Sequence, residues 1–294
     1  QIYKEMSIGT AVPSAAQLVA VQHYFIQTKS VCDYYTAGLY EAEALALVRK
    51  LFEEGHETLI MSGGSMFYID AVCNSLAHIP TADLEIRRKL QIRLENEGME
   101  SLLEELHRRD PEAYATMDLS NRQRVFRAVE ICLTTGKAYS SFKRKASADR
   151  GFTIEKIGLN RPREILYERI NKRVIQMMDE GLEAEVRSLT AFRQQTALQT
   201  VGYKEIFDYF DGNCSLDEAV SLIQRNTRHY AKRQLTWFRR EKDVIWIHKN
   251  EFLYQDDEIL EFMLAWIKKR NIIVWICSHI LQVMVYMLAI GEDM

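Results

Sequence analysis

Paired cysteines and a strong net charge are both missing from this chain of 294 residues. Its five cysteines are scattered and form no Cys-x-x-Cys pair, which gives no indication of a zinc ribbon or a redox dithiol and favours free thiols in a reducing compartment. A formal net charge of −3 excludes a protein that coats nucleic acid with a generally basic surface. Any nucleic-acid site must therefore be a local patch, and a cytoplasmic globular protein is expected.

The clearest local patch is a basic stretch near the end of the ordinary globular sequence. A Ser-x-x-Glu capping box at Ser215 and Glu218 predicts the start of a long helix. Such a charge run is often only a solvated face, but the interleaved Trp237 and Phe238 favour RNA, because guanidinium groups bind phosphates and aromatic rings stack on unpaired bases. At 3.6 residues per turn, one broad face of this helix carries Arg225, Arg228, His229, Lys232, Arg233, Thr236, Arg239 and Arg240.

The first part of the chain has the pattern of an α/β fold. An amphipathic helix is predicted over residues 34–55, followed by a buried strand at 58–61, the turn Ser62-Gly63-Gly64-Ser65 and a helix over 66–73. This order predicts a parallel sheet. The turn then lies at the carboxyl end of a strand, where ligands of such sheets usually bind, although simple strand-to-helix packing explains a Gly-Gly turn as well.

Residues 80–136 have a different character and predict a block of polar helices inserted into the sheet domain. Helices are expected over 84–97 and 102–109, and a third is expected to begin at a capping box formed by Ser120 and Gln123. The third helix carries arginines that are either solvated or phosphate-binding, namely Arg122, Arg124 and Arg127.

After this block the chain is expected to return to the sheet. Residues 153–159 and 244–247 have the pattern of strands, and the segments between them have the pattern of helices. The predicted organisation has three parts. Residues 1–84 and 151–250 form an α/β core, residues 85–150 form a helical insertion, and residues 251–294 form a hydrophobic tail.

Six stretches of the sequence, in the correct order, closely resemble the tRNA dimethylallyltransferases, also called tRNA isopentenyltransferases. They are QIYKEMSIGTAVP, SGGSMFY, NRQRVFRAVE, RINKRVIQMMDEGLEAEV, QTVGYKE and AKRQLTWFRR, and the similarity covers about residues 1–250. The resemblance implies a nucleotide-binding, P-loop-type parallel sheet with an all-helical insertion that grips the tRNA anticodon stem-loop. It also implies a monomer that transfers a dimethylallyl group from dimethylallyl diphosphate to N6 of the adenosine 3′ of the anticodon, with Mg²⁺.

Matching positions imply roles for individual residues. Ser65 is similar to the hydroxyl residue of the family's Gly-Gly-Thr/Ser turn, and Arg173 to the arginine associated with the diphosphate. Contacts with tRNA are implied for Gln1, Arg87, Gln123, Arg124, Arg127, Thr200, Val201, Gly202, Tyr203, Lys204, Lys232, Arg233, Gln234, Thr236, Trp237 and Arg239.

The P-loop of the family is not found in these residues. Family members carry a glycine-rich loop ending in Lys-Thr, which cradles the diphosphate, and an Asp that acts as general base, but no G-x-x-x-x-G-K-[ST] occurs here. Both are expected to precede Gln1, so the chain is interpreted as an N-terminally truncated member with impaired transfer. Two further hypotheses are an RNA-binding module without catalysis and, from the α/β pattern alone, a phosphotransferase.

Residues 272–290 lie outside the resemblance and contain no charged residue. The run follows Lys268-Lys269-Arg270 and could cross a bilayer with the basic residues on the cytosolic side. Ser278, His279 and Gln282 interrupt it. A helix packed on the core, or a terminus foreign to the family, is therefore preferred to a membrane span.

Overall fold

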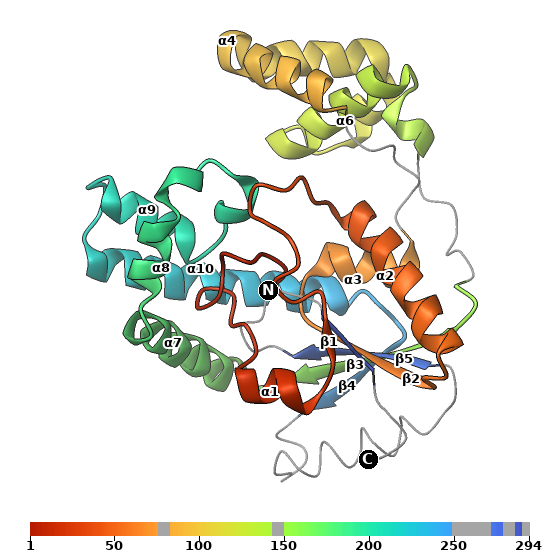
Figure 1. Cartoon of the computed structure of the whole chain (residues 1–294). Coiled ribbons are helices and arrows are strands. Elements are labelled where there is room, and N and C mark those ends of the chain that lie inside the picture. Colours follow the sequence, from red (N-terminus) through yellow and green to blue (C-terminus); the bar gives the residue numbers. More distant parts are fainter. Residues whose placement is uncertain (76–82, 143–149, 249–271, 279–285, 290–294) are drawn as a thin grey trace. The chain divides into compact units, whose positions relative to one another are not determined.

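The computed structural model describes residues 1–75, 83–142, 150–248, 272–278 and 286–289 (Figure 1). The chain divides into two compact units. The helical unit is Asn74–Ala148, and the sheet unit combines Gln1–Cys73 with Asp149–Met294. The fold is thus an α/β core with an all-helical insertion, as the sequence predicts.

The sheet unit is built on a six-stranded sheet with the order β1-β6-β2-β5-β3-β4. Neighbouring strands among β2, β5, β3 and β4 are parallel, whereas β6 is antiparallel to both β2 and β1 (Figure 1). The strands predicted at 58–61, 153–159 and 244–247 are confirmed. The six strands are β1 (His23–Tyr24), β2 (Thr58–Ser62), β3 (Thr153–Asn160), β4 (Val244–His248), β5 (Ile272–Ser278) and β6 (Tyr286–Ala289).

The hydrophobic tail contributes two of these strands, β5 and β6, so the helical alternative for residues 272–290 is wrong where the structure describes them. β5 pairs in parallel with β2 on one side and with β3 on the other, which makes it an internal strand of the sheet. An internal parallel strand is covered on both faces and reads as a continuous apolar run, so the run alone could not distinguish it from a helix. Among the helices that the structure describes, none is long and apolar enough to cross a bilayer; His279 and Gln282 lie outside the described residues.

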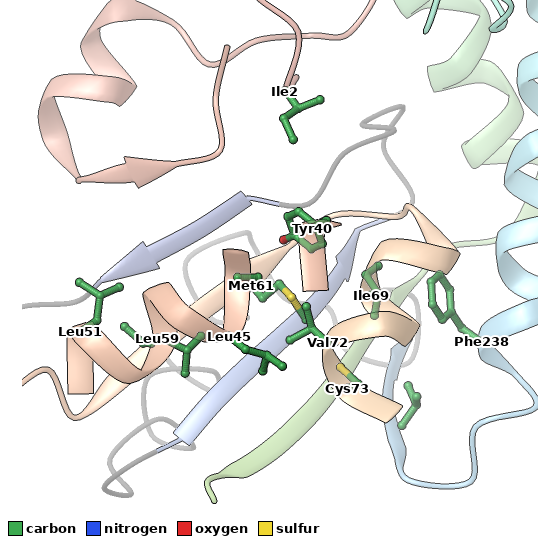
Figure 2. Close-up of a cluster of buried hydrophobic side chains, with 13 residues drawn as sticks. Ile2, Tyr40, Leu45, Leu51, Leu59, Met61, Ile69, Val72, Cys73 and Phe238 are labelled. Atoms are coloured by element: carbon green, nitrogen blue, oxygen red, sulfur yellow. The ribbon is translucent and has the colours of Figure 1, made fainter. Parts of the chain in front are cut away.

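A first hydrophobic cluster fixes the helices that follow β2. Figure 2 shows Tyr40, Leu45 and Leu51 of α2 meeting β2 and α3, with Phe238 entering from α10. All of these side chains are buried. Burial of this kind contributes roughly 1.5–3 kcal/mol for each large apolar side chain. The turn between β2 and α3 is therefore held by packing on both sides.

The helices of the sheet unit follow the predicted pattern, with small shifts at their ends. The Ser215 capping box is confirmed, since the Ser215 hydroxyl accepts from Glu218 N–H and the Glu218 carboxylate accepts from Ser215 N–H. A second cluster joins α7 to α10 through residues such as Val174, Leu182 and Ile223. The helices are α1 (Ala15–Ala20), α2 (Ala37–Glu53), α3 (Met66–Asn74), α7 (Arg163–Asp179), α8 (Leu182–Ser188), α9 (Tyr203–Phe210) and α10 (Leu216–Phe238).

The helical unit contains α4 (Leu84–Arg109), α5 (Pro111–Thr116) and α6 (Arg122–Thr135). The two helices expected over 84–109 are present as one element with a sharp break at Gly98, whose φ of 77° is readily adopted only by glycine. The capping box predicted at Ser120 is wrong. Asn121 caps α6 instead, with its side-chain oxygen accepting from Arg124 N–H.

Two buried glutamates form ion pairs with several arginines of this unit. Glu130 is fully buried on α6 and accepts from Arg87 at 3.0 Å and from Arg127. The carboxylate of Glu105 on α4 forms ion pairs with Arg93, Arg108 and Arg109. Buried carboxylates need such partners because an unpaired charge is costly to desolvate. The arginines of this unit are therefore used partly to hold its helices together.

Replacement of Glu130 by Gln should destabilise the helical unit by about 2–3 kcal/mol, because two charge-assisted hydrogen bonds are weakened at a site without water. Native-state hydrogen exchange of the α6 amides measures this change. The exposed Glu100→Gln on α4 is the matched control and should have little effect. Equal protection in both variants would contradict a structural role for Glu130.

Acid should weaken the helical unit through Glu105. Partial burial raises the pKa of Glu105, but hydrogen bonds from Arg109, Arg108 and Arg93 outweigh this and lower it to about 2. Because the folded pKa lies below the ordinary value, the stabilisation is complete above about pH 4.5 and is lost as the pH falls towards about 2. Urea denaturation followed by circular dichroism should show this loss in the parent and in the exposed Glu104→Gln control, and a reduced loss in Glu105→Gln.

Candidate functional site

The turn after β2, Ser62-Gly63-Gly64-Ser65, lies at the carboxyl end of a parallel strand. Gly63 has a φ of 149°, a conformation that residues with a side chain rarely adopt. Ser65 lies at the start of α3, where its carbonyl oxygen accepts from Ile69 N–H at 3.0 Å. The turn therefore brings glycine backbone and a hydroxyl residue to the edge of the sheet where ligands of α/β proteins bind.

The C-terminal half of α10 is fastened directly to this turn. The buried Gln234 donates from Nε2 to the Gly64 carbonyl oxygen at 2.8 Å, across 170 positions of sequence. One turn further, Trp237 contacts the ring of Phe67 edge to face, with the ring centres 5.2 Å apart. The structure thus brings together the Ser65 turn, to which the resemblance gives a catalytic role, and the Lys232–Arg239 segment, for which it implies tRNA contacts.

The basic face predicted for α10 is present and open to solvent. Lys232, Arg233, Thr236 and Arg239 are all exposed, whereas Ala231, Gln234 and Phe238 on the other side are buried. No carboxylate of the described residues forms an ion pair with Lys232, Arg233 or Arg239. Cationic side chains that are not paired with a carboxylate remain available to an anionic ligand such as an RNA backbone.

The Val201-Gly202-Tyr203 segment lies largely inside the protein. Tyr203 is fully buried, and its hydroxyl donates to Glu185 Oε1 at 2.6 Å. Burial, followed by the nearby Glu185 carboxylate, raises the pKa of Tyr203 well above its ordinary range. Glu185 also accepts from the backbone N–H groups of residues 7, 8 and 9. Tyr203 therefore anchors an N-terminal loop and does not present its side chain to RNA, while Lys204 beside it is exposed.

Gln1 is the second expected RNA contact that the structure buries. Its side-chain amide nitrogen donates to the backbone carbonyl oxygen of Ala11, and the backbone carbonyl oxygen of Gln1 accepts from Gln27 N–H at 2.6 Å. These bonds hold two N-terminal segments together. Gln1 is fully buried, so it offers no exposed surface for an RNA contact.

The predicted site residues on α4, α6 and α7 have different surroundings. Arg87 and Arg127 bind the buried Glu130, whereas Gln123 and Arg124 are exposed on the first turn of α6. Arg173 on α7, expected at the diphosphate, forms a 3.3 Å ion pair with Glu180. The carboxylate of Glu180 already neutralises this guanidinium.

Two residues of the site were missed from the sequence. Phe67 is 58% exposed, which is unusual for a large aromatic side chain, and it lies beside the Gly-Gly turn. Its position two residues after Ser65 could have indicated a role. Glu185 gave no local signal, because all its partners are distant in sequence.

The Mg²⁺ that the resemblance implies has no ready-made cluster of protein ligands in the described residues. No group of three His, Cys, Asp or Glu side chains among them lies close enough together to hold a metal ion. Mg²⁺ usually keeps several waters and is bound by one or two carboxylates together with substrate phosphates, not by a cage of protein side chains.

Comparison with known proteins identifies the family of this chain. The family model described as IPP transferase matches residues 1–241. The chain belongs to the IPP transferase family. Among its relatives, tRNA dimethylallyltransferase 1 of Bacteroides thetaiotaomicron is 47% identical over 263 residues, covering 90% of this chain and 84% of the relative. The tRNA dimethylallyltransferase of Christiangramia forsetii is 45% identical over 264 residues, covering 88% and 87%.

Solved structures of IPP transferases have the same fold. The tRNA isopentenylpyrophosphate transferase of Bacillus halodurans superimposes with a TM-score of 0.59 at 32% identity, covering 91% of this chain and 84% of the other. A eukaryotic dimethylallyltransferase described as acting on tRNA gives a TM-score of 0.68 at 19% identity, covering 92% and 73%, and supports the fold alone.

Replacement of Gln234 by Leu should loosen the attachment of α10 to the Gly-Gly turn. The change keeps the side-chain volume but leaves the Gly64 carbonyl without its donor, at a cost of about 1–3 kcal/mol. Thermal unfolding of the whole chain should show a lower Tm than for the parent. The exposed Gln199→Leu serves as the control, and an equal Tm in the parent and Gln234→Leu would contradict the importance of this bond.

Proposed function

We propose that this IPP transferase modifies tRNA by moving a dimethylallyl group from dimethylallyl diphosphate to N6 of the adenosine 3′ of the anticodon. The names of the relatives support this reaction. The single observation that carries it is the 2.8 Å hydrogen bond from Gln234 to Gly64, which fixes an exposed basic helix beside a ligand-type turn. RNA binding and prenyl transfer then occupy neighbouring parts of one surface.

The reaction is an alkyl transfer to nitrogen. The N6 nitrogen of adenine attacks the first carbon of the dimethylallyl group, the bond from that carbon to the diphosphate oxygen breaks, and N6 loses one proton to a base. Diphosphate leaves with the electron pair of the broken bond. Since the adenine must leave its stack to be reached, the enzyme needs an apolar surface that receives the base.

The described residues supply positioning for this reaction. Arg233 and Arg239 are proposed to bind RNA phosphates, and the exposed Phe67 beside Trp237 offers an aromatic edge for an unstacked base. Gln123 and Arg124 of the helical unit are proposed to contact the anticodon arm. The Ser65 turn is proposed to contact the reacting groups. Arg173 would have to exchange Glu180 for the diphosphate to act there.

Transfer by these 294 residues alone is proposed to be weak, because they contain no G-x-x-x-x-G-K-[ST] sequence to cradle a diphosphate. The test compares this chain with one extended by an N-terminal segment that carries a family-type P-loop. Both receive an anticodon stem-loop and labelled dimethylallyl diphosphate. Binding by both with strong transfer by the extended chain supports the proposal, and equally strong transfer by both would refute the impairment.

An RNA-binding module without catalysis is the second candidate, favoured by the exposed basic face of α10. This candidate predicts that both the present chain and the extended chain bind the stem-loop and that neither transfers the dimethylallyl group. A stem-loop with guanosine in place of the target adenosine is the substrate control, because it offers the same phosphates without the N6 amine. Absence of stem-loop binding in both chains would contradict both candidates.

Replacement of Arg233 and Arg239 by Gln together should weaken binding of the stem-loop by about tenfold or more and should reduce its salt dependence, because fewer counterions are released. Filter binding at several salt concentrations measures both effects. Arg49→Gln removes an exposed arginine from α2 and should leave the affinity unchanged. Equal affinities for the parent and the double variant would show that α10 does not bind RNA.

A further inference from the structure

A buried lysine lies within strand β3. Lys156 is near the middle of this strand, opposite Val244 of β4 and Trp275 of β5, and only 6% of its side chain is exposed. Parallel strands that are covered on both faces are normally apolar, and lysine is almost never buried unless its ammonium group has partners. The position of Lys156 therefore needs a specific explanation.

The partners of Lys156 are two carboxylates from the turn between α10 and β4. Its Nζ lies 2.9 Å from Glu241 Oε2 and 3.0 Å from Asp243 Oδ2. Burial lowers the pKa of Lys156, but its hydrogen bonds to Glu241 and Asp243 outweigh this and raise the pKa above its ordinary value. The ammonium group therefore stays charged at neutral pH and holds both carboxylates against the sheet.

These carboxylates are close in sequence to the basic end of α10. Glu241 follows Arg240 directly, and Asp243 is four positions after Arg239. The chain turns tightly here, since Arg240 N–H donates to the carbonyl oxygen of Trp237 at 3.1 Å. On a helical turn, opposite charges three or four positions apart are neighbours that can pair.

The arginines nevertheless remain without these partners. Both Arg239 and Arg240 are exposed, and neither forms an ion pair with a carboxylate of the described residues. Glu241 and Asp243 are paired with Lys156 instead. The buried lysine thus competes with two surface arginines for the same carboxylates.

This competition affects the electrostatic field at the end of α10. A carboxylate beside a guanidinium cancels much of its attraction for a phosphate, and a carboxylate on the surface also repels the RNA backbone. Residues 239–243 contain three cations and two carboxylates. Without Lys156, most of the positive charge of this segment would be neutralised by its own acidic residues.

We propose that Lys156 is a positioning residue for RNA binding, which holds Glu241 and Asp243 away from Arg239 and Arg240 and so keeps the end of α10 cationic. Lys156 does not touch the RNA itself, because it is buried inside the sheet unit. The inference rests on the proposed function for the identity of the anionic partner. The ion pairs of Lys156 are present without RNA.

Replacement of Lys156 by Met keeps a long side chain but leaves two carboxylates without their cation. Filter binding with the anticodon stem-loop at low salt should show an affinity about fivefold lower than that of the parent, the effect of one exposed ion pair. The difference should shrink as salt is added, because the interaction between exposed charges is screened. Lys50→Met on α2 also breaks a Lys–Glu pair, with Glu54, and should leave the affinity unchanged.

Removal of the carboxylates together with the lysine separates an electrostatic role from a purely structural one. The triple variant Lys156→Met/Glu241→Gln/Asp243→Asn should regain the affinity of the parent, because no released negative charge is left beside Arg239. If Lys156 only fixed the shape of the turn, the triple variant would bind as weakly as Lys156→Met.

Circular dichroism verifies that each variant is folded. If Lys156→Met does not fold, Lys156→Met/Glu241→Gln takes its place in the comparison. In that variant only Asp243 loses its cation, and its side chain is already 63% exposed.

Equal affinities of the parent and Lys156→Met would overturn the inference, as would a triple variant that remains weak or a loss that does not decrease with salt. If the parent binds the stem-loop and the Arg233 and Arg239 double variant binds it less tightly, an unchanged Lys156→Met rejects the role of Lys156 and leaves the proposed RNA function intact. Absence of stem-loop binding by the parent rejects the RNA function itself.

Discussion

The hydrogen bond from Gln234 to the Gly64 carbonyl is the contact on which the arrangement of this IPP transferase depends. It is buried, so its loss would leave a polar atom without water, and it joins the long basic helix α10 to the turn after β2. Phe238, one turn away, adds apolar packing to the same junction. Binding surface and turn are consequently held as one rigid piece, which is what a reaction between two bound substrates requires.

Charge has two different uses in the two units. In the helical unit, Arg87 and Arg127 bind inward to Glu130, and their ion pairs serve the packing of α4 against α6. On α10, Arg233 and Arg239 have no ion-pair partner among the described residues and face solvent. Arginine content alone would not separate these uses. What separates them is whether a carboxylate lies within reach, and for Arg87 that carboxylate is 43 positions away.

Local features of the fold could be predicted from the sequence, and those fixed by distant contacts could not. The Ser215 cap and the strand at 58–62 follow from spacing and composition, which act over a few residues. Burial of Tyr203 depends on Glu185 and on a loop near the N-terminus, so no local pattern reveals it. The strand at 272–278 has an apolar run that fits a helix equally well.

The position of β5 has a consequence for synthesis. This strand lies between β2 and β3 and follows both of them in the chain, after α10 and β4 have also been made. The ribosome therefore releases the helical unit, whose contacts are short in sequence, well before the middle of the sheet can close. Until then β2 and β3 each have an edge that lacks its β5 partner and can pair with other nascent chains. β5 and β6 complete the sheet only after the strands on either side of β5 have been synthesised. The need for chaperones should therefore be greatest in the interval before β5 and β6 leave the ribosome.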